Sequence, residues 1–181
     1  MVGAIVEIGT SSINFWVPTY VTEYLGLSAE MGAGVFSFMS LLKIVSPFIC
    51  VFLYHKVIKD MIKLEAALFS LSAVFFVFLL FTSGSPILNI IFFSLAKLII
   101  GCASTVLWSI YIPSLAKYGS VSAGNGVFDF TGYAAAALLN AFFASFTNWS
   151  GVIVSWIVIM LVGLAGALVA MIITKGKEQE E

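Results

Sequence analysis

Four charged residues lie inside long apolar stretches of the sequence, where charge is costly. Glu7, Lys43, Lys97 and Asp129 are each flanked on both sides by mostly apolar residues. A charged side chain near the middle of a lipid bilayer costs at least about 2.5 to 3.5 kcal/mol on insertion scales, so each one indicates a functional site by default. Lysines attract anions, whereas a carboxylate can carry a proton or form a gating ion pair. The alternative interpretation is that opposite charges neutralise one another as buried pairs, or that a lysine side chain extends to the membrane surface.

The two lysines are predicted to lie at a similar depth. At about 1.5 Å per residue, Lys43 is about 18 Å along its helix from Met31, and Lys97 is about 15 Å along its helix from Ile87. Both distances correspond to the middle of a bilayer whose hydrocarbon core is about 30 Å thick. We therefore predict that Lys43 and Lys97 form an anion-attracting, substrate-binding centre.

The two carboxylates are predicted at another level of the same bundle. Glu7 and Asp129 each lie roughly 10 Å in from the ends of their helices, nearer the side that we assign below to the cytoplasm. We predict that one of them takes part in coupling or gating. Thr10 and Asn14, in the same helix as Glu7, could add hydrogen bonds to a ligand, or equally to a neighbouring helix.

The elements that must position these residues are long apolar helices. Of the 181 residues, 61 % are apolar and only 9 % are charged, which is too little polar surface for a water-soluble globule of this size. A helix needs roughly 20 apolar residues to cross a bilayer. The sequence therefore predicts an all-α, polytopic membrane protein whose transmembrane domain covers residues 1–174, followed by a tail at 175–181. The six predicted transmembrane helices cover approximately residues 2–24, 31–54, 64–81, 87–115, 122–146 and 151–174.

Polar and charged residues are unevenly shared among these six spans. The third and sixth lack charge in their interiors, so we expect them to be lipid-facing scaffold, and we expect the other four to surround a polar cavity. In the fifth span, small residues predict close helix packing or a moving contact, with Gly124, Gly126 and Gly132 as the candidates.

The lysines outside the spans predict the orientation. Six of the eight lie in residues 55–63, 116–121 or the tail, which fall on one side of a six-helix bundle. Because cytoplasmic loops retain an excess of lysine and arginine, both termini are predicted to be cytoplasmic.

Several classes of function have no candidate residues. His55 is the only histidine, Cys50 and Cys102 lack metal-ligand spacing, and no hydrolase, metalloprotease or nucleotide-binding motif occurs. We therefore expect no enzymatic activity, no metal and no cofactor. A net charge of −1 and the absence of arginine argue against nucleic-acid binding.

Three segments resemble a known family. Residues 16–20 (WVPTY) resemble the W-x-P-T-Y stretch that ends the seventh helix of organophosphate:phosphate antiporters, a branch of the major facilitator superfamily. Residues 125–133 (NGVFDFTGY) are similar to the opening of that family's eleventh helix, and residues 146–149 (FTNW) to the turn before its twelfth. Those antiporters have a phosphate-binding arginine where this chain has Thr10, and often a glycine where it has Asp129.

The resemblance implies the fold and function of a C-terminal six-helix half of a secondary transporter, in the plasma membrane of a bacterium. Such a half lines a central site for a small organic anion, but it cannot enclose the solute alone. The implied partners are the solute, the lipid bilayer and a separate N-terminal half, or further copies of the chain if it associates with itself. The chain would then be a split-gene half or a truncated product. Two alternatives stay open: a transporter-derived anion sensor that does not transport, and a channel-like homo-oligomer.

Overall fold

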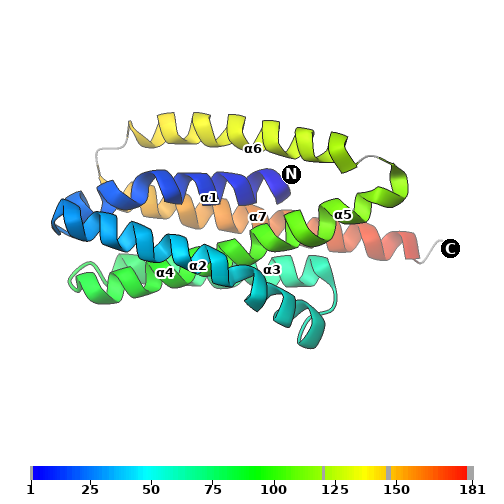
Figure 1. Cartoon of the computed structure of the whole chain (residues 1–181), viewed down its shortest axis with the longest axis horizontal. Coiled ribbons are helices and arrows are strands. Elements are labelled where there is room, and N and C mark those ends of the chain that lie inside the picture. The colour runs from blue at the N-terminus through cyan, green and yellow to red at the C-terminus, as the bar shows by residue number, and fades with distance from the viewer. Residues whose placement is uncertain (1, 120, 146–147, 179–181) are drawn as a thin grey trace.

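The protein consists of helices joined by short connectors. The computed structural model describes residues 2–119, 121–145 and 148–178, and no strand occurs in them. In chain order the elements are α1 (Val2–Thr19), the π-helical η1 (Tyr20–Tyr24), α2 (Ala29–Lys56), α3 (Met61–Phe81), α4 (Pro86–Thr105), the π-helical η2 (Val106–Tyr111), α5 (Ile112–Ser114), the 3₁₀-helical η3 (Leu115–Tyr118), α6 (Val121–Phe143) and α7 (Trp149–Glu178). Because η1 continues α1, and η2, α5 and η3 continue α4, these elements form six rods (Figure 1).

The prediction of an all-α chain is confirmed. The six rods follow the six predicted ranges and differ from them by a few residues at the ends. At the C-terminal end, α7 continues to Glu178, so the first residues of the predicted tail are helical. Phe146 and Thr147, which belong to one of the segments that carry the resemblance, lie outside the described residues.

Five rods in the described part of the chain are long and apolar enough to cross a membrane, rather than the six predicted. They cover Ala29–Lys56, Met61–Phe81, Pro86–Lys117, Val121–Phe143 and Trp149–Thr174. The first rod is not among them, and it is the rod that carries Glu7, Thr10 and Asn14. The polar residues that make this rod a candidate for a binding role also make it the weakest candidate for a membrane span.

Local sequence signals define the helix ends. The side chain of Asp60 accepts hydrogen bonds from the backbone N–H groups of Ile62 (2.9 Å) and Lys63 (3.1 Å) at the N-terminus of α3. This is the capping pattern expected of an aspartate at that position. At Gly119, which follows η3, φ is +71°, a conformation that glycine adopts without steric cost. The connectors are short, and consecutive rods run antiparallel (Figure 1).

The rods pack in pairs around an aromatic core. α3 packs against α7 and α4, α1 packs against α6, and α2 packs against α4. Tyr20, Phe93 and Trp156 are fully buried, and their rings meet at centroid distances of 5.0 to 6.1 Å. Trp156 also donates a hydrogen bond to the hydroxyl of Ser12 (3.0 Å), which ties α7 to α1.

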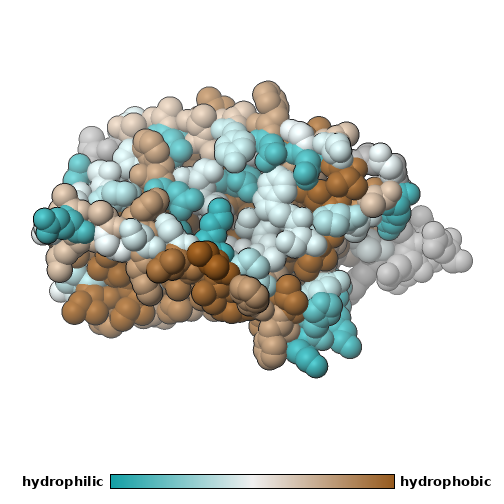
Figure 2. All heavy atoms as spheres, viewed as in Figure 1, coloured by the Kyte–Doolittle hydropathy of each residue, from teal (hydrophilic) through white to brown (hydrophobic). Residues whose placement is uncertain are grey.

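One broad face of the bundle is formed by α1, α2 and α6 (Figure 1). Its middle carries hydrophilic side chains, whereas hydrophobic side chains gather along one edge (Figure 2). Large apolar side chains such as Phe48 on α2 and Phe130 on α6 are about three-quarters exposed. The bundle therefore exposes apolar surface that water alone does not solvate favourably.

Candidate functional site

Lys97 is the most deeply buried cation in the described residues. It lies near the middle of α4, only 8 % of its surface is exposed, and its ammonium has no hydrogen-bond partner in the described structure. The ring of Phe36 on α2 partly stabilises the positive charge through a cation–π contact, with its centroid 5.2 Å from Nζ. A cation–π contact of this kind recovers about 0.5 to 2 kcal/mol, which is less than the cost of burying a charge. The ammonium therefore lacks most of the stabilisation that it needs when charged.

Lys97 lines a small cavity between α1, α2 and α4. Its lining residues are Thr10, Ile13, Lys43, Lys97, Ile100, Gly101 and Ser104. The hydroxyl of Thr10 is buried there and, like the ammonium of Lys97, has no hydrogen-bond partner among the described residues. The cavity volume is about 10 Å³, enough for about one water molecule. Two rods thus place buried polar groups without hydrogen-bond partners in the cavity, and a third adds Lys43, but within this chain they leave no room for an organic solute.

Lys43 lies on the exposed side of this cavity. It belongs to the middle of α2, and its side chain is exposed on the bundle surface. Close packing of α2 on α4 keeps the two lysines near each other: a Cβ at Gly101 would lie 2.6 Å from the hydroxyl oxygen of Ser46. In addition, the thiol of Cys102 donates to the backbone carbonyl of Ser46 (3.4 Å). The small residue at 101 therefore allows a second cation to approach the first.

The carboxylates do not neutralise these lysines. Glu7 is buried, and its Oε1 accepts a hydrogen bond from the indole N–H of Trp108 (2.8 Å). Asp129 is half-buried on α6. Neither of them lines the lysine cavity. Within the described ranges the single ion pair is the exposed one between Lys63 and Asp60 (3.4 Å), so buried charge pairing, the main alternative in the sequence analysis, is absent there.

Of the remaining predicted site residues, some lie at contacts between helices and others lie away from such contacts. Asn14 is half-buried on α1 and does not line the cavity. At Gly132 a Cβ would lie 2.6 Å from Cβ of Glu7, and at Gly124 it would lie 2.8 Å from a methyl group of Leu115. Both glycines therefore lie at close contacts. Gly126 is exposed, and a Cβ there would meet no described atom within 4 Å, so the packing role predicted for it is not seen in this chain.

One charged residue was missed by the sequence analysis. Glu65 lies in α3, the rod that was expected to lack interior charge, and only 6 % of its surface is exposed. Its Oε2 has no hydrogen-bond partner in the described part of the chain. Glu65 follows directly after Leu64, where the predicted third span begins, so its type and position were visible. Its burial was not, because burial depends on the neighbouring rods.

Metal binding has no structural candidate in the described residues. No group of three or more His, Cys, Asp and Glu side chains in them is arranged to hold an ion. Cys50 and Cys102 are buried free thiols.

No protein-family model, no curated protein sequence and no solved structure matches this chain.

Proposed function

We propose that this chain lines one half of the central site of a secondary transporter of the major facilitator type, and that its solute is a small organic anion. The observation that carries the proposal is the pair Lys43 and Lys97, which line one cavity and form no ion pair with a carboxylate among the described residues. A buried ammonium costs several kcal/mol unless an opposite charge approaches it. An anionic solute supplies that charge, and the hydroxyl of Thr10 supplies a hydrogen bond.

The packing of the rods supports this type of fold. Transporters of this superfamily contain two three-helix repeats of inverted topology in each half. In this chain such a repeat would relate α1 to α4, α2 to α6 and α3 to α7. The contact between α1 and α6 then corresponds to the contact between α4 and α2, and both contacts occur. The contact of α3 with α7 maps onto itself. The two rods that such a repeat equates, α1 and α4, also both continue into a π-helical segment, and π-helical turns are frequent at functional sites.

The small volume of the cavity supports the proposal that a second protein half completes the solute site. A volume of about 10 Å³ cannot hold an organic anion, so the solute must lie against the open side of the cavity, where Lys43 is exposed. A second six-helix half, or another copy of this chain, would cover the face formed by α1, α2 and α6 and close the site. Rocking of the two halves about this site would then give alternating access.

The lysine-bearing connectors support a membrane orientation. The connectors between α2 and α3 and between η3 and α6 lie at the same end of the bundle as the C-terminus (Figure 1). The positive-inside rule assigns this end to the cytoplasm. The proposal therefore has the bundle in a bacterial plasma membrane, with Glu7 and Asp129 nearer the cytoplasmic side, as candidates for coupling or gating.

The test is anion binding to the purified full chain in nanodiscs. Succinate and sn-glycerol 3-phosphate serve as probes, and isothermal titration calorimetry measures their affinity. Replacing Lys97 or Lys43 with Met should weaken the binding of at least one probe about tenfold or more, because a bond to a charged group contributes roughly 1.5 to 3 kcal/mol. Lys63→Met is the matched control, since Lys63 is exposed and paired with Asp60. Equal binding by wild type and both cavity variants would contradict the proposal, as would the absence of saturable binding of either probe to wild type.

Flux measurements on proteoliposomes then separate the transporter from the two alternatives. Saturable uptake, by the chain alone or with an added N-terminal half, supports transport. Binding without uptake in the presence of a complete N-terminal half supports the sensor, and conductance that does not saturate supports the channel.

A further inference from the structure

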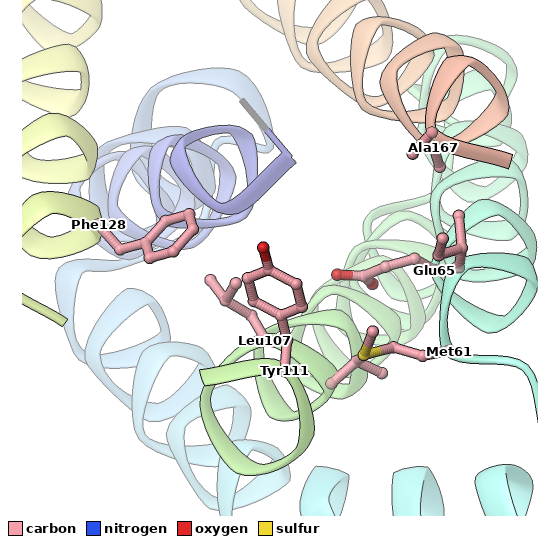
Figure 3. A pocket seen from close by; sticks show the side chains of 9 residues that line it. Met61, Glu65, Leu107, Tyr111, Phe128 and Ala167 are labelled. Atoms are coloured by element: carbon pink, nitrogen blue, oxygen red, sulfur yellow. The ribbon is translucent and has the colours of Figure 1, made fainter. Parts of the chain in front are cut away.

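A second and larger cavity lies away from the lysines. Its volume is about 220 Å³, and it lies between α3, η2, α6 and α7, near the end of the bundle that carries the lysine-bearing connectors (Figure 3). Most of its wall is apolar, with Met61, Ile62, Val106, Leu107, Ala167 and Ala170 contributing. It shares no lining residue with the lysine cavity, so the inference below does not rest on the proposed function.

The carboxyl group of Glu65 points from α3 into this cavity, toward Tyr111 (Figure 3). Its Oε2 has no hydrogen-bond partner in the described residues, although the residue is more than nine-tenths buried. The cation nearest to it in sequence, Lys63, is exposed and pairs with Asp60 instead. An ionised carboxylate buried among apolar groups costs several kcal/mol unless a cation or hydrogen-bond donors compensate it. No described residue that lines the cavity therefore supplies a positively charged partner for Glu65.

Two aromatic rings also line this cavity. Tyr111 from η2 and Phe128 from α6 meet edge to face, with ring centroids 6.0 Å apart and an interplanar angle of 86°. Both rings line the cavity, and the Tyr111 hydroxyl is directed into it (Figure 3). Aromatic faces attract organic ammonium groups through cation–π interaction, and a carboxylate adds a charge-assisted hydrogen bond.

We propose that this cavity binds an organic ammonium ion that carries a small apolar body. The ammonium lies between the carboxylate of Glu65 and the rings of Tyr111 and Phe128, and the apolar body lies against the residues of α3, η2 and α7. A cavity of about 150 Å³ holds benzene, so about 220 Å³ accommodates one aromatic ring with a short aminoalkyl chain. The same chemistry would also accept the ammonium headgroup of a lipid.

The test uses the full chain in nanodiscs made of phosphatidylglycerol, which has no ammonium group. The probe is 2-phenylethylamine, and its neutral analogue 2-phenylethanol reports apolar partitioning alone; equilibrium dialysis measures both. We expect saturable binding of the amine by wild type and at least about tenfold weaker binding by Glu65→Gln, because the variant keeps the shape but loses the charge. Glu30→Gln, at an exposed glutamate in the first turn of α2, is the matched control and should bind like wild type.

A second variant keeps the test decisive if Glu65→Gln does not fold. Ala170→Leu fills the cavity from α7 while Glu65 is retained, and it should abolish saturable binding of the amine. Nanodiscs with added phosphatidylethanolamine then identify the source of the ligand: competition with the amine assigns the site to a lipid headgroup, and the absence of competition assigns it to a free amine. Equal affinity of wild type and Glu65→Gln for the amine would overturn the proposal, and so would amine binding by wild type that is no stronger than binding of 2-phenylethanol.

Discussion

The contact between α6 and α1 predicts opposite effects for two glycines on the same helix. Gly132 faces Glu7, and an added Cβ would lie 2.6 Å from Cβ and 2.9 Å from Cγ of that residue. Gly126, about 1.7 turns earlier, faces open space. We therefore compare Gly132→Ala with Gly126→Ala, two variants with the same chemical change in the same helix.

The magnitude follows from two terms. Replacing glycine with alanine inside a helix favours folding by roughly 0.5 to 1 kcal/mol, because alanine has less backbone freedom to lose. This term applies to both variants. The close contact at Gly132 adds an overpacking cost of about 1 to 3 kcal/mol, because the atoms opposed to it are Cβ and Cγ of a buried side chain rather than a mobile tip. The free energy of unfolding should therefore be about 1 to 3 kcal/mol lower for Gly132→Ala than for Gly126→Ala, a factor of five or more in the folded-to-unfolded ratio.

The assay is unfolding of the purified chain in detergent micelles by a denaturing detergent, followed by circular dichroism and tryptophan fluorescence. Fluorescence gives a second readout, because displacement of Glu7 should disturb its hydrogen bond with the indole of Trp108. The reasoning fails if Gly126→Ala destabilises the protein as much as Gly132→Ala does, or if both variants are equally stable. Either result would mean that α6 does not approach α1 at Gly132 as closely as the structure describes.

Two further predictions concern stability. The pKa of Asp60 is lowered from its usual 3.8, mainly because its carboxylate accepts the backbone N–H of Lys63; a lowered pKa means that this stabilisation is present at neutral pH and is lost as the pH falls through the folded-state pKa. Asp60→Ala should therefore cost about 1 kcal/mol of unfolding free energy at neutral pH and less below about pH 4, and a cost that does not change with pH would count against the capping role. Trp156→Ala should cost about 3 to 5 kcal/mol, because a fully buried ring is removed, whereas Ser12→Ala, which removes only its hydrogen-bond acceptor, should cost about 1 to 3 kcal/mol. Equal costs in the same unfolding assay would show that the hydrogen bond, not the ring packing, dominates there.

The helices could be predicted from the sequence because their signals are local. Long apolar runs interrupted by charge, glycine and proline determine where a rod can begin and end, and no distant residue is needed to read them. The N-terminal cap at Asp60 and the turn at Gly119 are signals of the same kind. The polar residues of the first rod, which is not among the five rods long and apolar enough to cross a membrane, were also visible in the sequence.

The arrangement of the candidate site was less accessible to such reasoning. Counting residues placed Lys43 and Lys97 at a similar depth, and the structure brings them to one cavity. The same counting treated Glu7 as a possible partner for charge, whereas the structure pairs it with Trp108, 101 residues away in the chain. Depth along a helix can be read from spacing, but the direction of a side chain around the helix depends on which rod lies beside it.

The sequence by itself determined that this chain is all-helical, rich in apolar segments and supplied with a few charges that apolar surroundings penalise. Only the tertiary structure decided which of those charged groups have a hydrogen-bond partner: Glu7 has one, whereas the ammonium of Lys97 and Oε2 of Glu65 have none among the described residues. The physical reason is that apolar character is a property of single residues. The neutralisation of a buried charge, by contrast, requires two groups from different helices within a few ångströms, and the packing of the rods sets that distance.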